Sequence, residues 1–225
     1  MPRVTRLGRF LDSLEALHGP PADVGARDPF GMVLWENVAY LVPDERRREA
    51  FAELAKRVGT TPEKIRRARP EVLLSVARKG GMHPEQRAER LVRCAEIALS
   101  RFDGDLRRAV ALPPRGARRA LRLFPGIGEP GAEKILLFTG AEPVLALESN
   151  GLRVLLRLGY GEQAKSYAAT YRSVQAAVDR ELVRDCALLQ RAHLLLRAHG
   201  QRLCKSSRPD CDACPLEPDC AFARA

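Results

Sequence analysis

The sequence predicts an all-helical fold, and three observations agree on it. Apolar residues recur three and four positions apart through most of the chain, for example within 91–99 and within 188–196, which gathers them on one face of a helix. The strict alternation of apolar and polar residues that marks a half-buried strand is scarce. Glycine and proline interrupt the helical pattern often enough to predict about ten to twelve short helices.

The helix-breaking residues predict where the helices begin and end. They fall at Gly19 to Pro21, Pro43, Pro62, Pro70, Gly80 and Gly81, Pro113 and Pro114, Pro125 and Gly126, Gly140, and Pro143. Helical periodicity holds between these points, without an internal repeat or a low-complexity tract. After residue 200 the pattern is lost, and the chain becomes rich in Cys, Pro and Asp. This last segment is predicted to be a loop folded around a ligand.

The chain is strongly basic. Its 225 residues include 38 Lys and Arg against 28 Asp and Glu, a net charge of +10, and only six of the basic residues are Lys. This charge predicts a polyanionic partner, with nucleic acid the first candidate. A GC-rich genome also enriches Arg, so charge alone leaves two explanations open. The length allows one large domain or two small ones, each with a hydrophobic core.

Hydropathy and cysteine use indicate the compartment. No stretch has the apolar length of a signal peptide or the roughly 20 apolar residues of a membrane span, so we expect a cytoplasmic protein that does not bind a membrane. Six cysteines in a reducing compartment are not expected to form structural disulfides. Cys94 and Cys186 fall within helical patterns and are predicted to be small buried residues. The other four lie within the last 22 residues, which predicts a metal centre.

Cys204, Cys211, Cys214 and Cys220 place four thiolates in one short loop. A tetrahedral zinc ion and a [4Fe-4S] cluster both take four such ligands. A zinc ribbon usually carries two separated Cys-x2-Cys pairs, whereas here one pair is flanked by single cysteines at wider gaps. The spacing therefore favours the iron–sulfur cluster over zinc.

The segment Pro125 to Gly128 lies between an Arg-rich helix and a second helix that opens at Glu129 and Pro130. Glycines at 126 and 128 allow the backbone N–H groups of Gly126, Ile127 and Gly128 to turn outward beside a helix N-terminus. Such an arrangement binds one phosphate group. The turn by itself is common in proteins and is weak evidence for a site.

The hairpin followed by the cysteine loop resembles the order found in the endonuclease III superfamily of helix-hairpin-helix DNA glycosylases. The cysteine loop is similar to theirs also in its neighbours Lys205, Ser206, Arg208, Pro209 and Pro215. The resemblance implies a six-helix barrel over 28–138 and a second helical domain, 1–27 plus 139–225, that carries the [4Fe-4S] cluster loop. It implies a monomer that binds double-stranded DNA with a damaged, mismatched or abasic nucleotide, flips that nucleotide out of the stack, and presents Lys205 to the backbone.

The resemblance also assigns a catalytic carboxylate. The register that usually holds an Asp gives Glu148 here, one methylene longer. A carboxylate there stabilises the positive charge on the sugar as the glycosidic bond breaks, or orients a water. The alternative is that Glu148 only caps a helix, where an acidic group is favourable in any case.

Bifunctional relatives carry a nucleophilic lysine where this chain has Pro130, so a lyase built on that lysine is excluded. Two other amines remain conceivable as nucleophiles. Lys134 lies one helical turn further on, although a Lys beside Glu133 is more typical of a solvated surface pair. The amine of Pro2 becomes available if the initiator Met is removed.

The segment 28–36 resembles the first barrel helix of mismatch adenine glycosylases, in which a Glu at the register of Glu36 protonates the base. Burial in an apolar helix would favour its protonated form; the alternative is an ion pair with an Arg. The relatives' glutamine-rich continuation is absent, and Tyr40 takes its place. Tyr40 and Met82 are candidate wedges into the base stack, or alternatively cap a helix and pack in a loop. Trp35 is more typical of a core residue than of a base-stacking one.

Three functions follow from these residues. The first is a monofunctional DNA glycosylase in which Glu36 contacts the flipped base and Glu148 stabilises the sugar cation. The second is a noncatalytic reader of abasic or mismatched DNA, motivated by the changes at Glu148 and Pro130. The third is a weak abasic-site lyase. The sequence does not identify the base.

Overall fold

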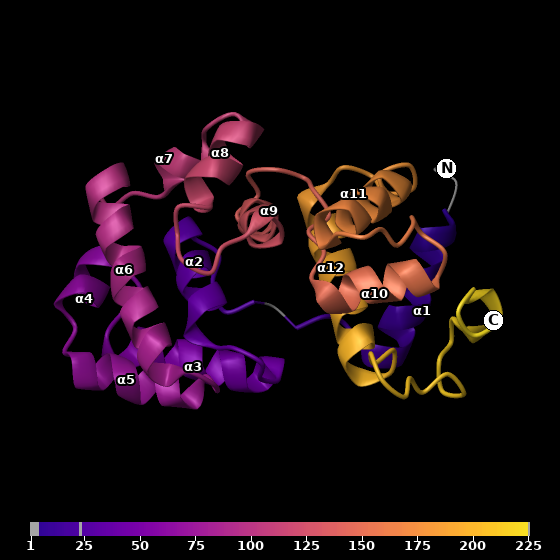
Figure 1. The fold of residues 1–225 in the computed structure, drawn as a ribbon, viewed down its shortest axis with the longest axis horizontal. Coiled ribbons are helices and arrows are strands. Elements are labelled where there is room, and N and C mark those ends of the chain that lie inside the picture. The colour runs from indigo at the N-terminus through magenta and orange to yellow at the C-terminus, as the bar shows by residue number, and fades with distance from the viewer. Residues whose placement is uncertain (1–4, 23, 225) are drawn as a thin grey trace. The chain divides into compact units, whose positions relative to one another are not determined.

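The computed structural model describes residues 5–22 and 24–224, and these residues form an all-helical fold, as predicted (Figure 1). Within these ranges a single isolated bridge, between Tyr40 and Gly81, is the only strand-like pairing, and no helix is long and apolar enough to cross a membrane. The helices are α1 (Arg6–His18), α2 (Pro29–Val38), α3 (Asp44–Arg57), α4 (Pro62–Arg67), α5 (Pro70–Lys79), α6 (Pro84–Phe102), α7 (Arg107–Val110), α8 (Pro114–Leu121), α9 (Glu129–Phe138), α10 (Ser149–Arg157), α11 (Tyr167–Val178), α12 (Cys186–Arg202) and the 3₁₀ helix η1 (Glu217–Asp219).

Most of the predicted breaks mark helix ends. Proline stands in the first two positions of six helices, where its missing N–H has no helical partner to lose, at Pro29, Pro62, Pro70, Pro84, Pro114 and Pro130. Gly19 follows α1 with φ +78°, a backbone conformation that side chains disfavour. The breakers therefore position the helix boundaries because of their backbone chemistry.

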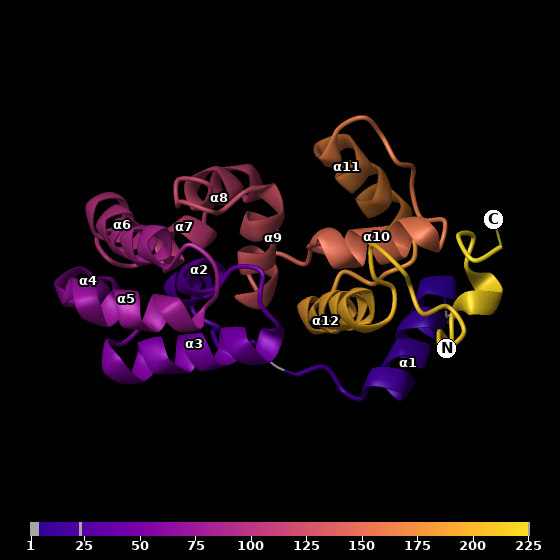
Figure 2. The ribbon, with the colours of Figure 1, turned by 60° about the horizontal axis from the view of Figure 1, so that its bottom comes forward.

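The chain divides into two compact units. The first, here called the hairpin unit, is Asp23–Glu142. Its central helix is α2, which packs against α3, α6 and α9, while α3 lies beside α5 (Figure 2). Nine of the ten residues of α2 are buried, and the exception is Glu36. Asp28 caps this helix by accepting a hydrogen bond from the Gly31 N–H at 2.9 Å.

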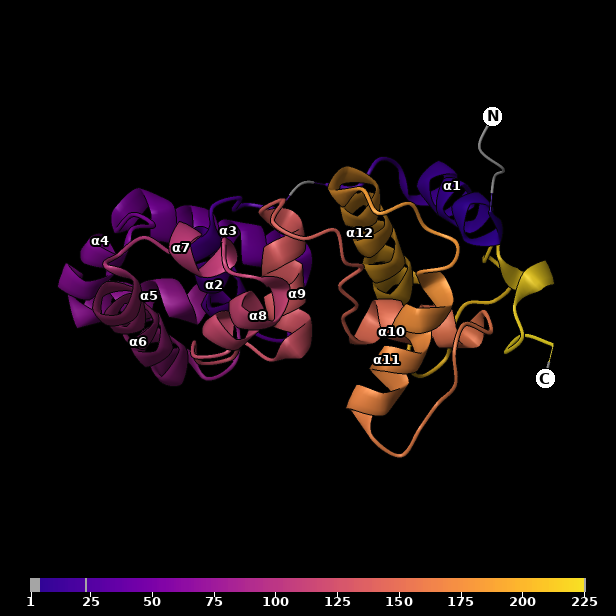
Figure 3. The same ribbon diagram turned by 90° about the horizontal axis from the view of Figure 1, so that it is seen from above.

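The second unit, here called the cysteine unit, joins Met1–Ala22 to Pro143–Ala225. In it α12 packs against both α1 and α10, and α10 also contacts α11 (Figure 3). The core between these helices is aliphatic, with Leu7, Leu14, Leu155 and Leu196 fully buried. The two parts of the chain that form this unit are thus held together by apolar burial across α1, α10 and α12.

Candidate active site

The hairpin between α8 and α9 is fixed against α2. Gly126 has φ +77°, and a Cβ at this position would lie 2.9 Å from the side-chain oxygen of Asn37. Only glycine therefore fits here, for two independent reasons. Phe124 and Ile127 are buried. The expectation that the Ile127 N–H turns outward is wrong, because this N–H donates to the Phe124 carbonyl at 3.2 Å within the turn. α9 begins after Gly128 without a side-chain cap, so its first N–H groups suit an anion.

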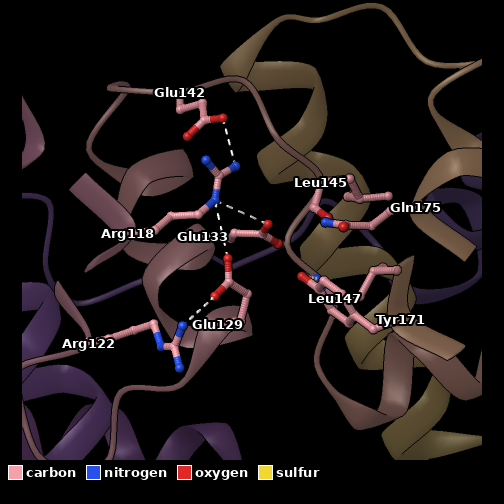
Figure 4. A network of polar contacts seen from close by, with 9 residues as sticks. All are labelled: Arg118, Arg122, Glu129, Glu133, Glu142, Leu145, Leu147, Tyr171 and Gln175. Carbon is pink, nitrogen blue, oxygen red and sulfur yellow. Dashed lines mark hydrogen bonds and ion pairs between the residues drawn. The ribbon is translucent and has the colours of Figure 1, made fainter. Parts of the chain in front are cut away.

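A network of ion pairs surrounds Arg118, which sequence reasoning missed (Figure 4). The Arg118 guanidinium lies 2.7 Å from Glu142, 3.4 Å from Glu133 and 3.6 Å from Glu129. Burial alone would lower the pKa of Arg118, but the three carboxylates outweigh it and raise that pKa. Arg122 pairs with the other oxygen of Glu129 at 3.2 Å. The network holds α8 and α9 at the hairpin.

Glu36 and Lys134 form an ion pair inside the hairpin unit. The Lys134 Nζ lies 2.8 Å from the Glu36 Oε1, and the two side chains are 11% and 20% exposed, respectively. The interpretation of Lys134 as a solvated surface partner of Glu133 is wrong, because both side chains are buried and Glu133 instead pairs with Arg118. A partner of Glu36 is therefore this lysine from α9.

Tyr40 and Met82 lie on two adjacent segments. The Tyr40 N–H donates to the Gly80 carbonyl at 2.9 Å, and Tyr40 forms the isolated bridge with Gly81. Leu41 has φ +53°, an uncommon conformation for a leucine. Tyr40, Leu41 and Met82 are each more than half exposed; together they are called the Tyr40–Met82 surface. Trp35, by contrast, is a core residue that packs edge-on against Phe51.

The buried side chain of Arg87 links the segment that carries Tyr40 to the segment that carries Met82. It is 2% exposed, and its guanidinium donates at 2.6–2.7 Å to the carbonyls of Val38, Ala77, Gly81 and Met82. Burial lowers the pKa of Arg87, and nearby Arg47 and Arg46 lower it further. The planar guanidinium can satisfy several carbonyls at once, and here it ties the end of α2 to the loop before α6.

Glu148 stands at the start of α10 in the cysteine unit. The segment before it is anchored by α11, because Leu147 donates its N–H to the Tyr171 hydroxyl at 3.1 Å and Gln175 donates to the Leu145 carbonyl at 3.2 Å (Figure 4). A ring nitrogen of His193 on α12 lies 2.6 Å from the Ala146 carbonyl. The chain entering Glu148 is therefore held from two sides.

The Glu148 carboxylate makes three contacts. One oxygen accepts from the Gly151 N–H at 2.8 Å, so Glu148 does cap α10. The other oxygen accepts from Asn150 at 2.8 Å and from the Arg197 guanidinium at 2.9 Å. Burial, and then the charge of Glu148, raise the pKa of Tyr167. Tyr167, with Ser149, Arg153 and Lys165, lines an open cavity along α10.

The four predicted cysteine ligands line one small cavity beside Arg157 and Phe222. Arg157 donates to the Cys204 sulfur at 3.3 Å, and a neutral ring nitrogen of His199 lies 3.5 Å from the Cys214 sulfur. Burial and then His18 lower the pKa of His199 to about 4. As placed, no group of three or more Cys, His, Asp or Glu in the described ranges could hold a metal ion.

The remaining predicted residues are placed as follows. Lys205 is exposed on the cysteine loop, and its carbonyl accepts from Arg157 at 2.7 Å. Cys94 is fully buried, as predicted, and burial raises its pKa to about 12. Cys186 is half-buried at the first position of α12, which differs from the prediction of burial. Pro2 lies outside the residues that the structure describes.

Comparisons with known proteins extend these observations. No family model matches the sequence. Endonuclease III of Thermotoga maritima is 27% identical over 197 residues, covering 88% of this chain and 84% of that protein. A thymine-DNA glycosylase of Aeropyrum pernix is 23% identical over 72% of this chain and 68% of that protein. A structure of an endonuclease III–DNA covalent intermediate has a TM-score of 0.75 at 19% identity, covering 100% and 98% of the two chains. The chain is thus similar in sequence to endonuclease III and to a thymine-DNA glycosylase, and it has the fold of endonuclease III.

Proposed function

We propose that the protein is a monofunctional DNA glycosylase that flips a damaged or mismatched base from duplex DNA and excises it by hydrolysis. The observation that carries this proposal is Glu148, a carboxylate held at a helix start in the register of the superfamily's catalytic acid. The backbone just before Glu148 is anchored by Tyr171 and Gln175, and its side chain is held by Gly151 and Arg197. A catalytic group held this firmly loses little free energy to reorganisation.

The reaction needs no covalent bond to the protein. The bond between C1′ and the base nitrogen breaks, and its electron pair leaves with the base. The Glu148 carboxylate stabilises the positive charge that develops on the sugar, and a water oxygen then bonds to C1′. The water proton passes to solvent, and the departed base takes up one proton. Glu148 thus acts by its charge and position.

A lyase step is not part of the proposal. Pro130 stands where bifunctional relatives carry lysine, and its ring nitrogen is part of the backbone. Lys134 is held at 2.8 Å from the Glu36 carboxylate, which favours the ammonium form, and an ammonium has no lone pair with which to attack C1′. Borohydride trapping on abasic DNA is expected to give no covalent adduct.

The DNA-binding surface combines two kinds of contact. Gly126 and Gly128 present the start of α9 to one backbone phosphate, and Lys205 adds a positive charge on the cysteine loop. The exposed side chains of Tyr40, Leu41 and Met82 fill the gap that a flipped nucleotide leaves in the stack. Apolar wedges of this kind are common where proteins unstack bases.

The cysteine loop holds a [4Fe-4S] cluster on Cys204, Cys211, Cys214 and Cys220. Support comes from the shared cavity, from the Arg157 guanidinium, which donates to the Cys204 sulfur, and from the His199 ring nitrogen 3.5 Å from the Cys214 sulfur. When bound, the cluster stabilises the loop that carries Lys205. Purified protein should show a broad visible absorbance with four irons per chain, and Cys214→Ser should lose both.

A duplex panel tests the proposed function. It contains uracil, thymine glycol, adenine opposite 8-oxoguanine, alkylated bases and an abasic site, and it is incubated with the wild type and Glu148→Gln. Base release from one duplex by the wild type only, with similar DNA affinity of both proteins, supports the glycosylase. The noncatalytic reader is the second candidate, because both oxygens of Glu148 already have partners. Tight binding without product on every duplex would establish the reader instead.

A further inference from the structure

The Glu36–Lys134 pair is the one charged feature of the buried helix α2. Every other residue of that helix is buried, and Asn37, the other polar one, donates its side chain to the Val33 carbonyl. Glu36 lies in the last turn of α2, where an acidic group does not stabilise the helix end. Its known partner comes from a different helix, α9, which also forms the second arm of the hairpin. The pair therefore has no evident role in building secondary structure.

Both members of the pair are expected to be charged. An ammonium 2.8 Å from a carboxylate favours the ionised form of each group. Neighbouring Glu133 has a charged partner of its own, since it pairs with Arg118 at 3.4 Å. The Glu36 and Lys134 side chains are 20% and 11% exposed, so each keeps a small part of its surface open to solvent. The site thus offers an acceptor-only carboxylate beside a donor-only ammonium.

We propose that this pair recognises the imide edge of a flipped pyrimidine, so that the excised base is of the uracil or thymine class. The proposal rests on the proposed glycosylase function. An imide presents one N3–H between two carbonyl oxygens. Glu36 accepts the hydrogen bond from N3–H, while Lys134 donates to an adjacent carbonyl oxygen. Cytosine carries no N–H at N3, so it leaves the Glu36 carboxylate without that donor.

The Glu36–Lys134 pair also suits the departure of an imide pyrimidine as an anion. When the C1′–N1 bond of a pyrimidine breaks, its electron pair spreads over N1 and the two carbonyl oxygens. The Lys134 ammonium stabilises that negative charge, and the base then takes its proton from solvent. Adenine departs more easily when an acid protonates its ring, and an ionised Glu36 holds no proton to give. On this proposal the pair favours imide pyrimidines over purines, and Glu36 accepts a hydrogen bond from the base in place of donating a proton to it.

Leaving-group dependence tests this assignment. Single-turnover excision is measured on duplexes with uracil, thymine and 5-fluorouracil opposite guanine, and with adenine opposite 8-oxoguanine. Fluorine stabilises the departing anion, so 5-fluorouracil needs Lys134 least. Lys134→Met should slow release of uracil and thymine about 10²-fold, with a clearly smaller loss on 5-fluorouracil. Lys134→Arg should recover part of the rate, because it keeps the charge.

Glu133→Gln is the matched control. It alters a buried acid next to Lys134 on the same helix. Any loss in the rate of base release should therefore be equal for all of the pyrimidines. Thermal melting and affinity for abasic DNA confirm that each variant is folded.

Equal losses on uracil and 5-fluorouracil in Lys134→Met would overturn the role of the ammonium. Wild-type release of purines alone would overturn the base class but keep the glycosylase, whereas release of no base from any duplex would overturn the proposed function itself.

Discussion

Glu36 and Glu148 are both glutamates, but they occupy different positions in their helices and have different partners. Glu148 begins a helix, caps it, and shares its second oxygen between Asn150 and Arg197. Glu36 lies inside a buried helix, with Lys134 as its charged partner. The first carboxylate stabilises its own local structure, and the second contributes nothing to helix ends. A substitution at Glu148 therefore changes folding and chemistry together, whereas one at Glu36 tests mainly the ion pair.

The largest expected effect is on catalysis at Glu148. Glu148→Gln keeps an oxygen for the Gly151 N–H but removes the negative charge that stabilises the sugar cation. We expect base release to fall about 10²–10³-fold with little change in DNA affinity. Single-turnover kinetics and fluorescence anisotropy measure the two quantities. Glu148→Asp is the control that keeps the charge; if it is as slow as Glu148→Gln, then position matters more than charge.

The second effect concerns the end of the helix that carries Glu36. Arg87→Met removes the donors for four buried or half-buried carbonyls and should lower the free energy of unfolding by about 3–5 kcal/mol, as for other broken buried charge networks. Urea denaturation of Arg87→Met is compared with Arg93→Met, an exposed arginine on the same helix. Equal stability of the two variants would contradict the role of Arg87 in joining α2 to the loop before α6.

A third effect is the coupling between Glu36 and Lys134. Because the pair is partly exposed, either single change, Glu36→Leu or Lys134→Met, should cost about 1–3 kcal/mol by leaving one charge without its partner. The double variant should cost clearly less than the sum, since apolar side chains can replace an ion pair at little cost. A double-mutant cycle measures this coupling. Additive losses would mean that the two side chains act independently.

The smallest effect on stability is expected at the Tyr40–Met82 surface. Met82→Ala should change the free energy of unfolding by less than about 0.5 kcal/mol, because the side chain is exposed. Affinity for DNA with a flipped or abasic nucleotide should nevertheless fall several-fold. Leu112→Ala, at another exposed apolar side chain of the same unit, is the control. An equal fall in DNA affinity for both variants would contradict a specific role of Met82 in DNA binding.

Local features of the molecule were predictable and long-range ones were not. The helical fold follows from periodicity and from prolines such as Pro62 and Pro114, because these act on their own helix. The position of Glu148 at a helix start was equally local. No sequence pattern indicated the role of Arg87 or the pairing of Lys134 with Glu36. Both depend on partners from other elements, and the partners of Arg87 are backbone carbonyls, which every residue has. Only the folded chain reveals which of 32 arginines is buried.

α10 connects the carboxylate to the cysteine loop through a single rigid element. It begins after Glu148 and ends at Arg157, and at about 1.5 Å per residue it spans roughly 14 Å. Arg153 donates to the Cys204 carbonyl at 2.9 Å, and Arg157 donates to the Lys205 carbonyl. Oxidative loss of the proposed cluster would therefore release the far end of the helix that Glu148, the proposed catalytic carboxylate, caps. Damage to the cysteine loop would then slow the proposed chemistry as well as weaken the contact of Lys205 with DNA.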